Sequence, residues 1–430
     1  MDRSTYDIYL DILRRELVCA LGCTEPIAIA YAAAVARQTL GRPAQRMEVE
    51  ASGNIIKNVK SVFVPNTGGL RGIPAAAAAG MAAGDPALEL EVLSSIGEGE
   101  QAAIRQYLAD TPIAVKLADS PFIFDIAIRA WAGEDSALVR IVNYHTNIVR
   151  VERNGQVLKE VEAQAAAEEG LTDKSVLTVE GILEFAREAA LADVEDAVGR
   201  QVRYNTAIAQ EGLRGDYGAN IGKVLLATYG DDVKIRAKAM AAAGSDARMN
   251  GCGLPVVIVS GSGNQGLTAS LPVVEYAKEL GADWETTLRA VLVSDLVTIH
   301  LKAEIGRLSA YCGAVSAGCG SGAGIAWLYG REKEPQALLK DVSHTIVNAL
   351  AVDSGIVCDG AKASCAAKIA SAVDAGILGF TMYQHGQQFR GGDGIITKGV
   401  EETIRNIGLL ATQGMRETDR EILDIMTTRC

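Results

Sequence analysis

Four of the eight cysteines in this 430-residue chain stand in two short segments with the same spacing. The segments are YCGAVSAGC, residues 311–319, and VCDGAKASC, residues 357–365. On one continuous helix, thiols seven positions apart share a face but lie roughly 10 Å apart along the axis, so a single metal ion cannot bind both. A larger cluster can, if the backbone breaks between the thiols, and Asp359-Gly360 offers such a break. The alternative is that all four are small buried core residues.

A further cysteine, Cys23, stands in the segment LGCTEP at an expected break between two helices. Gly22 ends one helical run, and Pro26 suits the first position of the next, with Thr24 or Glu25 at the cap. A thiol beside a helix N-terminus can have a lowered pKa, which would suit a general base. The alternative is a buried cysteine in a helix-turn-helix corner.

The loop GSGNQG, residues 261–266, follows an apolar run and precedes a helical pattern. It matches the G-x-G-x-x-G spacing of dinucleotide-binding loops, and Asp283 lies at the distance expected for the ribose-binding acid. Because Asp283 falls between two helical patterns, we favour a small-molecule anion site over a dinucleotide site. The loop also resembles the phosphate cradle of pyridoxal-phosphate lyases, but the upstream Lys234 and Lys238 lie in no Schiff-base motif.

The elements that must position these residues are predicted from hydrophobic periodicity. Residues 4–40 are expected to be helical with a break at Gly22, and residues 46–65 and 121–160 to form strands with a hairpin turn at Asn154-Gly155. From residue 177 the pattern is helical, except at 256–260, which suits a strand or a buried helix. We therefore predict an α+β fold. It has an α+β domain with a small mixed sheet at residues 1–165 and a mostly helical domain at 166–430.

Composition excludes several classes of protein. The net charge is −12 and no cluster of Lys and Arg occurs, which argues against nucleic acid and anionic membranes as partners. The N-terminus is a charged amphipathic segment and not a signal peptide, so we expect a cytoplasmic protein. In a reducing compartment, clustered cysteines indicate metal binding or catalysis before disulfides. The abundance of Ala and Gly predicts closely packed helices.

Taken together, these segments resemble a known enzyme family. The order of GSGNQGLTASLPVV, AYCGAVSAGC and CDGAKASC is similar to that in the iron–sulfur L-serine dehydratases. LGCTEP, SGNIIKNV and VPNTGG add a closer resemblance to the L-cysteine desulfidases, a related group, over nearly the whole chain. The serine dehydratases have C-D-P where this chain has C-D-G, which favours cysteine as the substrate.

The resemblance implies a 4Fe-4S cluster held by Cys312, Cys358 and Cys365, with one iron left open as a Lewis acid. It gives no role to Cys319, and Cys430 is a further ligand candidate because a C-terminal cysteine reaches the site in some serine dehydratases. Cys23 is the candidate base. Polar side chains in or beside Gly-containing turns are candidates for binding substrate: Asn54, Asn66, Thr67, Asn264 and Gln265.

The expected function is therefore β-elimination of L-cysteine to pyruvate, ammonia and hydrogen sulfide. Two alternatives remain: an L-serine dehydratase using the same cluster, and a non-catalytic small-molecule binding protein on the same fold. The predicted partner is the small-molecule substrate, and a homodimer is possible.

Overall fold

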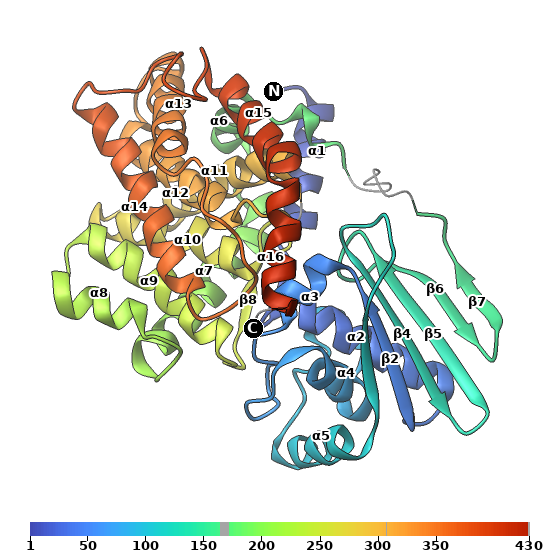
Figure 1. The fold of residues 1–430 in the computed structure, drawn as a ribbon. Helices are drawn as coiled ribbons and strands as arrows, with labels where there is room; N and C mark the ends of the chain where they lie inside the picture. The colour runs from blue at the N-terminus through green and yellow to red at the C-terminus, as the bar shows by residue number, and fades with distance from the viewer. Residues whose placement is uncertain (164–171, 307, 429–430) are drawn as a thin grey trace.

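Two groups of elements lie side by side in the computed structural model, which describes residues 1–163, 172–306 and 308–428 (Figure 1). A mixed sheet with covering helices forms an α/β part, and a larger group of helices forms a helical part, which confirms the predicted α+β class. The elements of the α/β part are α2 (Thr24–Leu40), β2 (Arg46–Ala51), α3 (Gly53–Val59), α4 (Gly72–Ala83), η1 (Pro86–Glu91), α5 (Glu98–Asp110), β3 (Ile113–Leu117), β4 (Asp125–Ala132), β5 (Asp135–Val142), β6 (Ile148–Arg153) and β7 (Gln156–Glu160).

The sheet has the strand order β3-β2-β4-β5-β6-β7, with β2 and β3 parallel and every other pair antiparallel. Helix α2 packs on one face. The other face carries charged side chains, among them the ion pair of Arg140 with Asp125. The β6–β7 turn has positive φ at both Asn154 (53°) and Gly155 (79°), which confirms the type I′ hairpin.

The prediction of strands throughout residues 46–65 is wrong beyond Ala51. Gly53–Val59 forms helix α3, whose Ile55 and Val59 are fully buried one turn apart. These β-branched residues have an i, i+4 spacing that suits one helix face as well as a strand, and burial of that face decides for the helix. Helix α3 thereby brings Asn54 and Lys57 towards the helical part.

The helical part contains both ends of the described chain. Helix α1 (Arg3–Glu16) packs against two much later helices, α7 and α11, and β1 (Cys19–Leu21) pairs antiparallel with β8 (Pro255–Val257). The ambiguous run at 256–260 thus begins as a strand. The predicted division at residue 165 falls on residues outside those described and stays a prediction. The remaining helices are α6 (Val179–Glu188), α7 (Leu191–Arg214), α8 (Ile221–Tyr229), α9 (Val233–Met249), α10 (Gly263–Glu279), α11 (Trp284–Ile305), α12 (Gly313–Gly330), α13 (Pro335–Val352), α14 (Cys365–Gln384), α15 (Val400–Leu409) and α16 (Arg416–Thr428), with short turns of helix at η2 (Lys174–Val176) and η3 (Leu410–Gly414).

Glycines let α12 and α14 pack with their backbones in contact. A Cβ added at Gly318 would lie 2.3 Å from the carbonyl oxygen of Ala372, and one at Gly376 would lie 2.1 Å from that of Gly318. Gly322 in turn lies against Gly376. The contacts advance in the same direction along both helices, so the helices run parallel and their N-termini lie at the same end. This close approach is what the Ala/Gly-rich sequence predicts.

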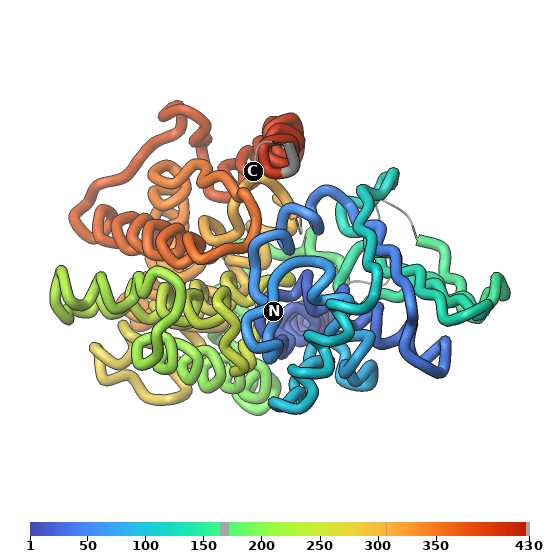
Figure 2. Tube along the Cα trace, turned by 60° about the horizontal axis from the view of Figure 1, so that its bottom comes forward, coloured from blue at the N-terminus to red at the C-terminus, as the bar shows by residue number. Residues whose placement is uncertain are grey.

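Helix α16 lies at the junction of the two parts and contacts α3 (Figures 1 and 2). Its Asp419 accepts hydrogen bonds from Lys57 Nζ at 2.5 Å and Asn54 Nδ2 at 2.9 Å. Among the described residues, only α14 is long and apolar enough to span a membrane, and 56% of that stretch is buried inside the protein, as in an ordinary core helix.

Candidate functional site

Two of the predicted cluster cysteines meet through a short backbone pairing. Tyr311 and Val357 form an antiparallel bridge. The amide of Cys312 donates to the carbonyl of Ile356 at 2.9 Å, and the amide of Cys358 donates to that of Ala310 at 2.7 Å. Chain segments more than forty residues apart are thus fixed beside each other, and both cysteines line one cavity.

Helix starts position the cysteines on either side of this bridge. Cys312 is the N-cap of α12, and Cys365 is the first residue of α14, after the loop that follows Cys358. Because α12 and α14 are parallel, the positive ends of both helix dipoles face the same region and favour negative charge there. The two cysteine pairs with seven-residue spacing therefore differ in structure. Cys358 and Cys365 are separated by a backbone break, as predicted, whereas Cys319 lies inside α12 as a fully buried core residue.

The thiols influence each other's ionisation. A hydrogen bond from the Cys312 thiol lowers the pKa of Cys358, with help from the positive charges of Lys57 and Lys362. The same hydrogen bond, together with burial, raises the pKa of Cys312. Burial raises the pKa of Cys365. One thiolate is therefore already favoured at the position where three cysteines gather.

A cavity of about 100 Å³ lies at this place and is formed by both parts of the molecule. It brings together residues that the sequence analysis singled out from five separate segments. These are Cys23, Asn54, Asn264, Gln265, Cys312, Cys358 and Cys365.

Three of the predicted substrate-binding side chains present unsatisfied oxygens here. Asn264 and Gln265 lie in the first turn of α10, and Gln265 packs directly against Gly313, beside Cys312. The side-chain oxygens of Asn54, Asn264 and Gln265 are buried and accept no hydrogen bond. Buried polar atoms are normally paired, so these oxygens are available to a ligand.

Asn66 and Thr67 are not brought to this cavity. Asn66 donates to the carbonyl of Leu93 at 3.0 Å, and the Thr67 hydroxyl donates to the carbonyl of Val64 at 2.7 Å. Thr67 closes the turn in which it stands, whereas Asn66 ties this turn to the segment of Leu93, so these polar groups are used within the protein. The sequence shows a polar Gly-rich turn but not the direction in which its side chains point.

Cys23 is the N-cap of α2, but the expected lowering of its pKa is wrong. The thiol is buried and donates to Glu25 Oε2 at 3.1 Å. Burial, followed by the charge of Glu25, raises the pKa of Cys23 well above its usual value. Glu25 also accepts a hydrogen bond from Asn58 Nδ2 at 3.1 Å, so the thiol is one member of a buried polar array.

Sequence reasoning missed the charged groups of the cavity. Glu25, Lys302 and Lys368 line it, as does Arg248 from the last turn of α9. A Cβ added at Gly263 would lie 2.3 Å from Arg248 Nε, so the guanidinium lies directly against the start of α10. The only signal in the sequence is a charged residue at the end of an Ala-rich helix, followed by a Gly-rich loop.

The structure does not support the two cofactor interpretations of the GSGNQG loop. The strand before the loop, β8, belongs to a two-stranded antiparallel sheet and not to a parallel βαβ unit. Asp283 is the N-cap of α11, where it accepts from the amide of Thr286 at 2.8 Å. Lys234 and Lys238 both pair with Asp374, so neither resembles a Schiff-base lysine.

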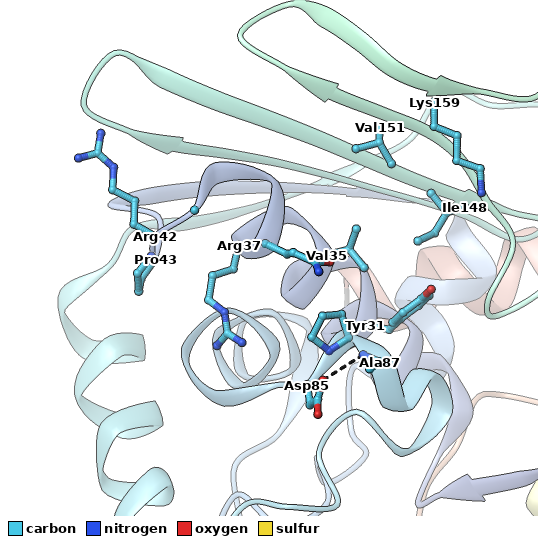
Figure 3. Close-up of a pocket in the computed structure, with 13 residues that line it drawn as sticks. Tyr31, Val35, Arg37, Arg42, Pro43, Asp85, Ala87, Ile148, Val151 and Lys159 are labelled. Atoms are coloured by element: carbon cyan, nitrogen blue, oxygen red, sulfur yellow. Dashed lines mark hydrogen bonds between the residues drawn. The ribbon is translucent and has the colours of Figure 1, made fainter.

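A larger hollow, of about 720 Å³, lies in the α/β part between α2, η1 and the sheet (Figure 3). Two of the cations that line it, Arg37 and Arg42, have partners within the protein. Arg37 donates to the carbonyls of Met81 and Gly84, and Arg42 pairs with Asp135 at 2.9 Å. No cysteine lines it. We therefore place the candidate site at the smaller cavity.

The three cavity cysteines fit an iron–sulfur cluster better than a single metal ion. Among residues 1–163, 172–306 and 308–428, no set of three or more His, Cys, Asp or Glu side chains is arranged to hold one ion. Cluster thiolates bind different irons and so need not converge on one point. The donors are all sulfur, the ligand that iron–sulfur clusters require, and two helix N-termini face them. Cys430 lies outside the described residues.

Comparison with known proteins supports the resemblance to the serine dehydratases and leaves the closer resemblance to the cysteine desulfidases untested. Residues 87–424 match the family model of the serine dehydratase alpha chain. The chain is 58% identical to a UPF0597 protein of Desulfitobacterium hafniense, over 99% of this chain and 97% of that protein. It is 52% identical to a UPF0597 protein of Lachnoclostridium phytofermentans, over 98% and 99% of the two chains. A UPF0597 protein of Aeromonas salmonicida is 39% identical over 98% of this chain.

Proposed function

We propose that this chain, which belongs to the serine dehydratase alpha chain family, is a lyase that eliminates hydrogen sulfide from L-cysteine at a 4Fe-4S cluster. The observation that carries the proposal is the meeting of Cys312, Cys358 and Cys365 in one cavity with unsatisfied amide oxygens. The family supports a serine dehydratase-like enzyme. The choice of cysteine and the cluster are proposals.

The three thiolates would hold the cluster and leave one iron open. That iron would supply Lewis acidity towards the substrate. The chain's own residues account for the other requirements of an elimination. The amide oxygens of Asn54, Asn264 and Gln265 accept hydrogen bonds from the substrate's ammonium group and fix its orientation.

The proton leaves the substrate towards the Cys23–Glu25 pair. The raised pKa of Cys23 keeps the thiol protonated in the resting site and makes its thiolate a strong base. The thiol passes its proton to Glu25 Oε2, 3.1 Å away, as the sulfur accepts the α-proton of the substrate. The Cα=Cβ bond forms as the Cβ–S bond breaks, and the departing sulfur takes the proton held by Glu25 and leaves as hydrogen sulfide, which returns Glu25 to its carboxylate form. Aminoacrylate remains and hydrolyses to pyruvate and ammonia without further catalysis.

The family model supports one other substrate. L-Serine would undergo the same elimination with water as the leaving group, and the description of the family as serine dehydratase favours it. The two substrates differ only in the departing atom, so the same cavity residues would act on both.

An anaerobic assay separates these functions. Protein purified under nitrogen should contain iron and acid-labile sulfide in the proportions of one 4Fe-4S cluster per chain. It should release sulfide and pyruvate in equal amounts from L-cysteine, and faster than pyruvate from L-serine. Turnover of serine but not cysteine would establish a serine dehydratase. A fully loaded protein that acts on neither would contradict the lyase reading, and a colourless but active protein would contradict the cluster.

A further inference from the structure

Arg248 is a buried cation without a partner. Its side chain is only 2% exposed, and among the described residues it makes no ion pair and no hydrogen bond, with Nε buried and unsatisfied. By contrast, Arg236 on the same helix pairs with Asp231 and Glu279. Burying an unpaired guanidinium is costly, and a protein retains one when an anion joins it in the functional state.

The groups around Arg248 indicate which kind of ligand carries this anion. The guanidinium lies against Gly263, so it is held beside the first turn of α10, where the oxygens of Asn264 and Gln265 are unsatisfied. This side of the cavity therefore offers the guanidinium as a two-bond donor for a carboxylate, next to amide oxygens that can accept from an ammonium group. The two groups together match the zwitterion of an α-amino acid. Glu25, in the same cavity, accepts hydrogen bonds from Cys23 and Asn58 and forms no ion pair with Arg248.

Arg248 shares the cavity with the candidate base. Both Arg248 and Cys23 line it, and the positive charge of Arg248 acts on the Cys23 thiol. A carboxylate bound at Arg248 would therefore hold the substrate in the cavity that contains Cys23.

We propose that Arg248 binds the α-carboxylate of the substrate and restricts the enzyme to amino acids with a free carboxylate. This deepens the proposed function and rests on it, because it takes the cavity as the substrate site. A forked, two-bond contact with the carboxylate fixes the rotation of the substrate about its Cα–C bond. Amines, esters and amides of cysteine would lose that contact and be rejected.

The test compares Arg248→Met and Arg248→Lys with Arg236→Met, a control on the same helix outside the cavity. The ligand is L-alanine, which has the same carboxylate and ammonium groups but no leaving group, with L-alaninamide as the analogue without a carboxylate. L-Alanine should raise the melting temperature of the wild-type and Arg236→Met proteins. It should not protect Arg248→Met, should protect Arg248→Lys only weakly, and L-alaninamide should protect none.

Two further readouts exclude a structural role. Without ligand, Arg248→Met should melt at or above the wild-type temperature, because an unpaired buried charge has been removed, and it should keep its full iron content. The KM for L-cysteine should rise by at least about tenfold, the size of a lost charge-assisted pair, with a smaller change in kcat. Equal protection of Arg248→Met and wild type would overturn the inference, as would early melting or loss of iron in Arg248→Met alone.

Failure of the proposed reaction would look different. Arg248-dependent protection by L-alanine requires no turnover. A wild-type protein that shows it but consumes neither cysteine nor serine would retain the carboxylate site and refute the lyase. Turnover of cysteine with unchanged binding in Arg248→Met would retain the lyase and refute the carboxylate site.

Discussion

Replacing Gly376 by alanine should damage both the stability of the protein and its capacity to bind iron. The added Cβ would lie 2.1 Å from the carbonyl oxygen of Gly318, although real Cβ atoms keep at least 3.0 Å from such atoms. Because the obstacle is backbone on both sides, α14 must move away from α12 by roughly 1 Å. Overpacking of this kind costs about 1–3 kcal/mol, and the better helix propensity of alanine offsets up to about 1 kcal/mol of it.

The displacement matters for the site because the two helices begin at Cys312 and Cys365. Moving α14 changes the separation of these thiols, so the iron content of Gly376→Ala should fall more than its stability alone explains. Gly322→Ala, whose Cβ would lie 2.7 Å from the Gly376 carbonyl, should show the same effects at smaller size. The measurements are the urea midpoint and the iron per chain after anaerobic reconstitution.

Two control glycines complete the series. Gly99 in α5 has open space around its Cβ position, so Gly99→Ala should leave iron binding unchanged and slightly raise stability. Gly408 in α15 lies against Glu304 of α11, with 2.6 Å to its Cβ, so Gly408→Ala should lower stability without acting on the α12–α14 contact and should keep iron. If Gly376→Ala binds iron and resists urea like Gly99→Ala, the helix pair does not set the cysteine spacing.

Three further predictions concern individual side chains. Replacing Cys312, Cys358 or Cys365 by serine should abolish iron binding, whereas replacing Cys19 or Cys319 should leave it largely intact. The measurement is the iron content of each variant. Cys23→Ala should keep the iron and the KM for cysteine but lower kcat roughly a hundredfold, and full turnover would remove Cys23 from the mechanism. Asp295→Asn should flatten the pH dependence of stability. Burial raises the pKa of Asp295 to about 8, so the stability contributed by its protonated form is complete below about pH 4 and is lost as the pH rises through 8. In urea titrations the variant should match wild type at acidic pH and exceed it by a few kcal/mol at most above pH 8, and parallel curves would contradict this.

Local pattern was enough to predict the class of fold. Alternation and turn chemistry identified the β4–β7 meander, and Asp359-Gly360 indicated the backbone break between Cys358 and Cys365. The assignment of these cysteines as cluster ligands came from the resemblance to known enzymes and stays a prediction. Local pattern failed at α3, because β-branched residues at an i, i+4 spacing are compatible with a strand and only the core they pack against distinguishes the two. Local pattern also did not identify Arg248 as a residue of the site.

Burial and long-range pairing explain what local pattern could not show. The contact between Cys312 and Cys358 depends on a two-residue bridge between segments far apart in the chain. The raised pKa of Cys23 depends on Glu25 and on the surrounding protein excluding water, whereas a helix end alone predicts the opposite direction. The charge of Arg248 is visible in the sequence, but its lack of a partner is not.

The packing of α1 against α7 and α11, with β1 paired to β8, has a consequence for how the chain is made. In topological terms the α/β part is an insertion within the helical part, since the chain begins in one, passes through the other and returns. During synthesis α1 cannot pack until α7 and α11 emerge, well over a hundred residues later. The cavity cannot form until Cys365 has left the ribosome. The proposed cluster could therefore be inserted only into a nearly finished chain, and a prematurely terminated product would carry Cys23 and Asn54 without Cys365.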